Sequence, residues 1–190
     1  MQSKRRYGRV LGGLLALSAF SAAAATATAP DDGARGFDWE IGTWKTQVRR
    51  LTKPLTGSKD WVEYTGTSVI REVLDGRANL IELRVEGPTG RIHGTSLRLY
   101  NPQARQWSIH YASAHDGMLT PPLYGQFRDG RGEFYGPDNL NGRAILVRFV
   151  ISDMHADSAR FEQAYSDDGG RTWETNWIEV DTRIVGAQVP

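Results

Sequence analysis

The chain has 190 residues and no cysteine, and its 23 Lys and Arg residues nearly balance its 22 Asp and Glu residues. Without cysteine there is no disulfide framework, thiolate metal site, nucleophilic thiol or lipid-bearing cysteine, so stability must come from apolar burial. A nearly neutral chain also lacks the basic excess that phosphate binding needs, and we expect no nucleic acid partner.

The first 29 residues have the pattern of a secretory signal peptide. Four basic residues precede a short apolar run, Val10 to Phe20, and small residues follow it, which predicts cleavage near Ala27 or Ala29. We therefore expect a periplasmic or secreted protein with no integral membrane segment in the mature chain. Loss of the four basic residues leaves 19 against 22 acidic ones, a net charge of about −3. The alternatives are a twin-arginine signal at Arg5-Arg6 and a retained membrane anchor.

Residues 30–36 are rich in Pro, Asp and Gly and predict a flexible lead-in, and residues 37–186 predict one β domain. In that domain we find no amphipathic helix, while strand patterns recur between turns about every ten residues. The expected strands span residues 43–51, 61–73, 79–86, 92–100, 106–113, 119–128, 132–135, 144–152, 159–166 and 172–184.

Short connections predict the order in which these strands pair. Asp75-Gly76, Asp129-Gly130 and Asn141-Gly142 tolerate the positive φ that tight hairpins require, as does the longer turn at residues 168–170. Neighbours in sequence should therefore pair antiparallel. Because a long meander protects its edges by closing on itself, we expect an all-β fold, a single antiparallel up-and-down β-barrel of about ten strands.

The two ends of the domain carry a pair of motifs. Gly42-Thr43-Trp44 opens the first strand, and Arg183 follows the apolar part of the last. In these residues the sequence resembles the calycin group, which contains the lipocalins and fatty-acid-binding-like barrels. The resemblance implies that Trp44 plugs the closed end of the barrel while Arg183 lies across its ring. Such a cation–π contact contributes about 0.5 to 2 kcal/mol and has a structural role.

Three further stretches, residues 97–102, 106–107 and 166–177, are similar to uncharacterised secreted bacterial barrels, a resemblance that implies a fold and no activity. The last stretch also resembles the Asp-box of sialidases, which is a repeated structural hairpin. Only one copy is present. We therefore interpret Ser166, Asp168 and Gly170 as a hydrogen-bonded turn with Trp173 folded over it.

Aromatic residues at even spacing carry the main functional hypothesis. The triplets Trp107-Ile109-Tyr111, Phe161-Gln163-Tyr165 and Trp173-Thr175-Trp177 should each share one strand face. Facing inward, they would line a lumen that binds a small, mostly apolar molecule. The alternative is a filled core. The predicted ligand-binding residues are Trp107, Tyr111, Trp173 and Trp177.

Other functions remain open. His93 and His110 fall on adjacent predicted strands, but no histidine pair has metal-ligand spacing, and the histidine near the C-terminus of a haem-binding relative has no counterpart, so we expect no metal and no cofactor. An enzyme on the same barrel would use a lumen histidine or carboxylate as acid or base. An interaction module would use the rim at residues 115–117 and Pro121-Pro122. Neither the ligand nor the oligomeric state follows from the sequence.

Overall fold

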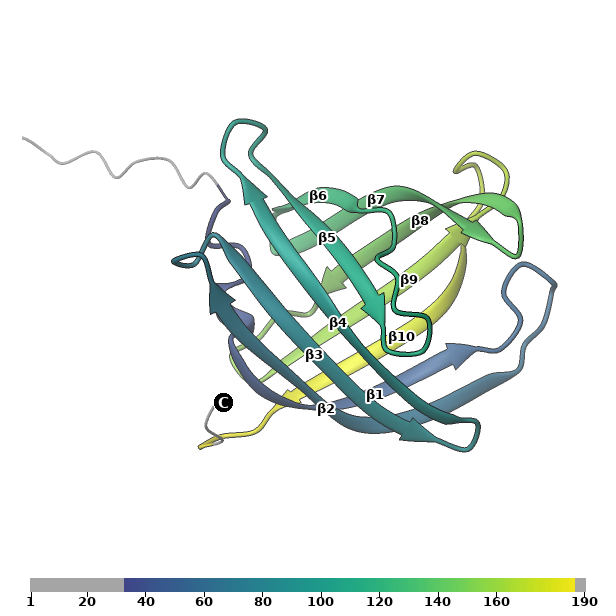
Figure 1. Ribbon diagram of the computed structural model, residues 1–190, viewed down its shortest axis with the longest axis horizontal. Helices are drawn as coiled ribbons and strands as arrows, with labels where there is room; N and C mark the ends of the chain where they lie inside the picture. Colours follow the sequence, from purple (N-terminus) through teal and green to yellow (C-terminus); the bar gives the residue numbers. More distant parts are fainter. Residues whose placement is uncertain (1–32, 187–190) are drawn as a thin grey trace, which may run out of the picture. The chain divides into compact units, whose positions relative to one another are not determined.

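Ten antiparallel strands form a closed barrel in the computed structural model, which describes residues 33–186 (Figure 1). The predicted signal peptide lies outside the described residues. Each strand pairs with its neighbours in sequence and the first pairs with the last, so the up-and-down barrel is confirmed. The strands are β1 (Gly42–Leu51), β2 (Trp61–Val73), β3 (Ala78–Gly87), β4 (Gly90–Asn101), β5 (Gln106–Ser113), β6 (Leu123–Arg128), β7 (Arg131–Leu140), β8 (Arg143–Ser152), β9 (Ser158–Ser166) and β10 (Glu174–Arg183).

The predicted hairpin turns have the expected backbone. In Asp75-Gly76, Asp129-Gly130 and Asn141-Gly142 both residues have positive φ, between 50° and 84°. Two successive residues of this conformation match the right-handed twist of the paired strands, and Asp, Asn and Gly adopt it at low cost. Local turn chemistry therefore sets the order of the meander.

Closure joins β1 to β10, in a register that runs from Trp44 opposite Arg183 to Arg50 opposite Trp177. The barrel is weakest between β5 and β6, which pair at only three positions. The predicted strand 119–128 begins later, at Leu123, because Pro121 and Pro122 cannot donate to a ladder. Residues before them fold back along β5, where Leu119 forms a single bridge with Ala112.

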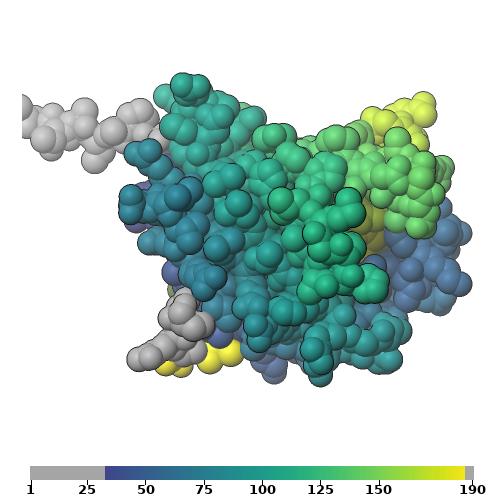
Figure 2. All heavy atoms as spheres, in the orientation of Figure 1, coloured from purple at the N-terminus to yellow at the C-terminus, as the bar shows by residue number. Residues whose placement is uncertain are grey.

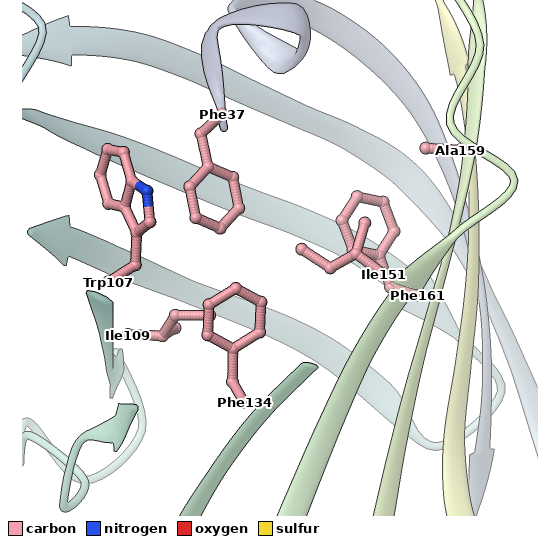
Figure 3. Packing of buried hydrophobic residues seen from close by; sticks show 7 residues of the cluster. All are labelled: Phe37, Trp107, Ile109, Phe134, Ile151, Ala159 and Phe161. Carbon is pink, nitrogen blue, oxygen red and sulfur yellow. The ribbon is translucent and has the colours of Figure 1, made fainter. Parts of the chain in front are cut away.

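A plug of aromatic side chains closes one end of the barrel (Figure 3). Phe37 enters from the segment that leads into the short helix η1 (Asp38–Glu40), is 1% exposed, and meets the edge of the Trp107 ring at 4.9 Å between centroids. Phe134 stacks on its other side at 5.8 Å. Gly33, which belongs to the predicted lead-in, is attached to the plug, because Trp107 Nε1 donates to its carbonyl at 2.8 Å.

The predicted closure residues lie at this plugged end. The Arg183 guanidinium is 4.0 Å from the centroid of the fully buried Trp44 ring and donates to the Ile41 carbonyl at 2.8 Å. Gly42 has φ +137°, and a Cβ there would lie 2.6 Å from Arg183 Nη1. Glycine is therefore required for the guanidinium to reach the ring.

The opposite end is surrounded by the β1–β2, β3–β4, β5–β6, β7–β8 and β9–β10 connections (Figure 1). Figure 2 shows the surface hollowed between the segment that follows β5 and the β7–β8 hairpin. Among the described residues no helix has the length and apolar character to cross a membrane.

Candidate functional site

The lumen contains a cavity of about 810 Å³. It extends from a polar layer above the plug, formed by Glu40, Arg98, Glu179 and Asp181, to the open end of the barrel, which we call the mouth. This volume lies within the range of small-molecule sites. The alternative of a filled core therefore describes only the plugged end of the barrel, and the part between the plug and the open end contains the cavity. Its walls combine apolar and polar side chains, chiefly Ile81, Leu83, Val147, Phe149, Phe161, Tyr111, Tyr165, Gln163, Trp177, Glu179, Arg98 and Glu40.

Two of the four predicted ligand-binding residues line the cavity and two do not. Tyr111 and Trp177 line the cavity, on opposite sides of the barrel. Trp107 shares the inward face of β5 with Tyr111 but belongs to the plug, where it is 2% exposed. Trp173 lies on the outer surface, where its ring packs against Tyr135 and the Arg148 guanidinium, 4.9 Å from the ring centroid.

The expectation that Trp173 and Trp177 share one face is wrong, because a bulge in β10 shifts the register between Thr175 and Trp177. One extra residue reverses the alternation of all side chains before it. The predicted turn is confirmed: the Ser166 hydroxyl donates to Asp168 Oδ1 at 2.8 Å, and Trp173 Nε1 donates to the Gly170 carbonyl at 3.0 Å. Trp173 therefore fastens the β9–β10 connection from outside.

Two strands place charged residues inside the barrel and apolar ones outside. In β10 the inward positions after the bulge are Trp177, Glu179 and Asp181, while Val180 is 38% exposed. In β4 Arg98 faces inward and is 4% exposed, while Leu97 and Leu99 on either side of it face outward. This inversion of the usual alternation builds a polar layer between the aromatic plug and the cavity.

Glu40 and Arg98 form a buried ion pair in this layer. Glu40 ends η1 and is 2% exposed, and both of its carboxylate oxygens contact the Arg98 guanidinium. The guanidinium also lies over the Phe37 ring, 4.1 Å from its centroid. Arg98 is thus held by a carboxylate and by the plug, although its Nε has no hydrogen-bond partner among the described residues.

Glu179 and Asp181 lie beside this pair without a cation of their own in the described part of the chain. Burial raises the pKa of the Glu179 carboxyl to about 7, against the effect of a 2.9 Å hydrogen bond from Trp177 Nε1. Burial, followed by the nearby Glu179 charge, raises the pKa of Asp181 to about 9. Near neutral pH the two carboxyls therefore retain protons that ordinary carboxyls have lost.

Hydrogen-bonding groups continue up the cavity wall. Gln163 Nε2 donates to Asn176 Oδ1 at 2.9 Å and to the Tyr165 hydroxyl at 3.1 Å. Burial raises the pKa values of Tyr111 and Tyr165 above the usual value for a phenol, so both stay neutral and can donate and accept. The wall is more polar than the mostly apolar lumen predicted from the sequence.

The mouth contains charges of both signs: Arg50 and Arg91 with Asp116 and Asp138. Of the predicted rim residues, His115, Asp116 and Pro121 line the mouth. Met118 and Leu119, which lie between the two predicted rim segments, are 70% and 66% exposed.

The predicted histidine pair does not form a site. His93 and His110 both point away from the strand face that carries Ile92 and Ile109, His93 toward Glu82 at 3.0 Å and His110 toward the Ser108 hydroxyl at 3.2 Å. No group of three His, Cys, Asp or Glu side chains within residues 33–186 is arranged to hold a metal ion.

The sequence analysis missed the polar layer of Glu40, Arg98, Glu179 and Asp181. One pattern could have revealed part of it. Once Arg183 is placed inward over Trp44, even spacing along the strand also places Asp181, Glu179 and Trp177 inward.

No protein-family model and no curated protein matches the sequence. The solved structures that match this chain include the following two. EF1p2_mFAP2b bound to DFHBI has a TM-score of 0.45 and 12% identity, covering 80% of this chain and 99% of that one. The S-type phycobiliprotein lyase CPES from Guillardia theta has a TM-score of 0.57 and 12% identity, covering 80% of this chain and 93% of that one. The likeness to the lyase concerns the fold alone and agrees with the closed antiparallel barrel.

Proposed function

We propose that this protein binds a small organic molecule in the lumen of its barrel. The observation that carries the proposal is the cavity of about 810 Å³ between the polar layer and the mouth. Aromatic rings of Phe149, Phe161 and Trp177 would hold the apolar part of the ligand, and the groups of Tyr111 and Gln163 would orient its polar part. The ligand is then amphipathic rather than wholly apolar.

The fold comparison is compatible with this proposal, since the similar lyase is named for its action on phycobiliproteins. Residues and substrate do not transfer at this identity. The proposal therefore depends on the cavity of this chain.

The test combines a ligand screen with variants of two tryptophans, one in the cavity wall and one on the outer surface. A panel of fatty acids, isoprenoids, aromatic acids, aromatic amines and haem is screened by thermal shift and calorimetry, and native mass spectrometry detects co-purified ligand. For any ligand found, Trp177→Ala should lower the affinity at least tenfold, because it removes part of the cavity wall. A ligand should also raise the melting temperature by mass action.

Trp173→Ala is the matched control, because Trp173 packs on the outer surface against Tyr135 and Arg148. It should leave the affinity unchanged. Equal losses in both variants would place the ligand outside the lumen, and the absence of any binder in the panel would overturn the proposal.

A second candidate function is acid–base catalysis in the same lumen, favoured by the raised pKa of Glu179, about 7. A general acid or base works best when its pKa lies near the working pH. Any slow conversion of a bound ligand, followed by NMR, should then stop in Glu179→Gln. It should persist in Glu162→Gln, which alters a carboxylate that pairs with Arg160 on the outer face at 2.5 Å. Conversion at an unchanged rate in Glu179→Gln would contradict this role.

We also propose export, as the sequence predicts. The intact mass of protein recovered from the periplasm or the medium should show the loss of about 27 to 29 residues. Full-length protein found in the cytoplasm would contradict this location.

A further inference from the structure

We propose that the ligand of the lumen carries a protonated amine, that Glu179 in the cavity wall binds it, and that the neighbouring Asp181 adds to the attraction. This inference rests on the proposed function, since it names the chemical class of the molecule that enters the same cavity.

The polar layer contains more carboxyl groups than cations among the described residues. Three carboxyls, those of Glu40, Glu179 and Asp181, gather around one guanidinium, that of Arg98. Arg98 is already bound to Glu40 through both oxygens. Two carboxyls are therefore left without a cation among the described residues. A buried carboxylate is stable only when it is paired or protonated.

Hydrogen-bond donors are scarce around Glu179 and Asp181. Asp181 is 1% exposed, and neither of its carboxyl oxygens has a hydrogen-bond partner among residues 33–186. The Thr46 hydroxyl, opposite in register, lies close enough to the Asp181 carboxyl to lower its pKa, but it is shared with the Ser68 hydroxyl at 2.8 Å. Glu179 accepts one bond, from Trp177 Nε1. An ammonium group supplies three donors together with a positive charge, so it meets both deficits at once.

Aromatic side chains share the cavity wall with Glu179. The rings of Trp177, Tyr111 and Phe161 line the same cavity, and Phe161 lies opposite Glu179 in register. Aromatic faces attract cations, most strongly when water is excluded. The same rings can pack against an apolar group attached to the amine. A carboxylate ligand would instead approach two acidic groups at the base of the lumen. The cations of the cavity wall offer it less, because Arg98 is paired with Glu40 and Arg91 with Glu86, which leaves Arg50 at the mouth.

The protonation of the two carboxyls agrees with this geometry. Asp181 and Glu179 face Glu40 from η1 and Arg98 from β4, and burial raises the pKa values of both. An entering ammonium would displace protons from them, because a neighbouring positive charge favours the ionised carboxyl. Binding of an amine should then release protons to the solvent.

The test measures how tightly the full chain binds three compounds of similar shape that differ in charge: 2-(1-naphthyl)ethylamine, 2-(1-naphthyl)ethanol and 1-naphthylacetate. Calorimetry at pH 7.5 should give an affinity for the amine at least tenfold higher than for the alcohol, with the carboxylate weakest. Titrations in phosphate and in Tris, which differ in ionisation enthalpy, should show proton release with the amine and none with the alcohol.

Two variants test whether the carboxyls cause the preference for the amine. Glu179→Gln and Asp181→Asn should each lower the affinity for the amine at least tenfold and leave that for the alcohol unchanged, so binding of the alcohol also reports that the variants are folded. Glu162→Gln, on the outer face, should change neither affinity.

The outcomes separate this inference from the proposed function. If the alcohol or the carboxylate binds as tightly as the amine, the inference is overturned while ligand binding in the lumen stands. If none of the three compounds and no member of the wider panel binds, the proposed function fails and the inference fails with it.

Discussion

Replacing Trp44 with alanine is expected to lower the free energy of unfolding by about 3 to 5 kcal/mol, the range of large-to-small changes in a core. The indole is fully buried, its Nε1 donates to the Glu40 carbonyl at 2.6 Å, and its ring meets the edge of Trp39 at 6.0 Å. The variant loses these contacts and also the surface on which the Arg183 guanidinium lies. Denaturant unfolding followed by circular dichroism measures the loss.

A double-mutant cycle separates the cation–π contact from the rest of the plug. Arg183→Ala should cost less than Trp44→Ala, although it removes hydrogen bonds to the carbonyls of Ile41 and Ala156. The double variant should lose less than the sum of the two single losses, because both variants remove the same contact. Strictly additive losses would show that the contact contributes nothing to stability.

Asp181→Asn is expected to stabilise the protein at alkaline pH. Between the pKa of an unfolded-state aspartate, near 4, and the raised folded-state pKa of about 9, the folded protein holds a proton that the unfolded chain has released. Stability therefore falls as the pH rises through this interval, by up to about 1.4 kcal/mol per pH unit for one group. The asparagine variant, which cannot ionise, avoids this loss.

At pH 8 we expect Asp181→Asn to be more stable than the wild type by at least about 2 kcal/mol, and the difference should shrink as the pH falls to about 3, where the carboxyl is protonated in both states. The measurement is the free energy of unfolding as a function of pH. Asp129→Asn makes the same chemical change in an exposed turn and should have little effect. A stability difference that stays constant with pH would assign the effect to packing instead.

The fold could be predicted because its determinants are local. Asp75-Gly76, Asp129-Gly130 and Asn141-Gly142 each specify a tight hairpin, and between the turns the strand patterns were close to those observed. A chain of antiparallel hairpins leaves few topologies once its two edges must be paired. Trp44 and Arg183 then indicated which end would be plugged, through a resemblance rather than through periodicity.

The site was harder to predict from the sequence, because its residues are exceptions to the alternation of inward and outward side chains along a strand. The bulge before Trp177 separates it from Trp173, although the sequence spacing is even. Arg98 points inward between two leucines, where the usual pattern would turn it to solvent. Glu40 and Phe37 reach the lumen from outside the strands, a placement that only the tertiary structure defines. Departures from local rules of this kind are expected at functional sites.

Closure between β1 and β10 also has a consequence for the kinetics of folding. Every other ladder joins strands that are adjacent in sequence, whereas the bond from Arg183 to Ile41 spans 142 positions. Contacts between distant residues form late, because the entropy of a long loop must be overcome first. Until they form, both strands present unpaired edges on which another chain can add. The contact of Trp44 with Arg183 therefore acts chiefly after the rate-limiting step, so its loss should accelerate unfolding more than it slows folding.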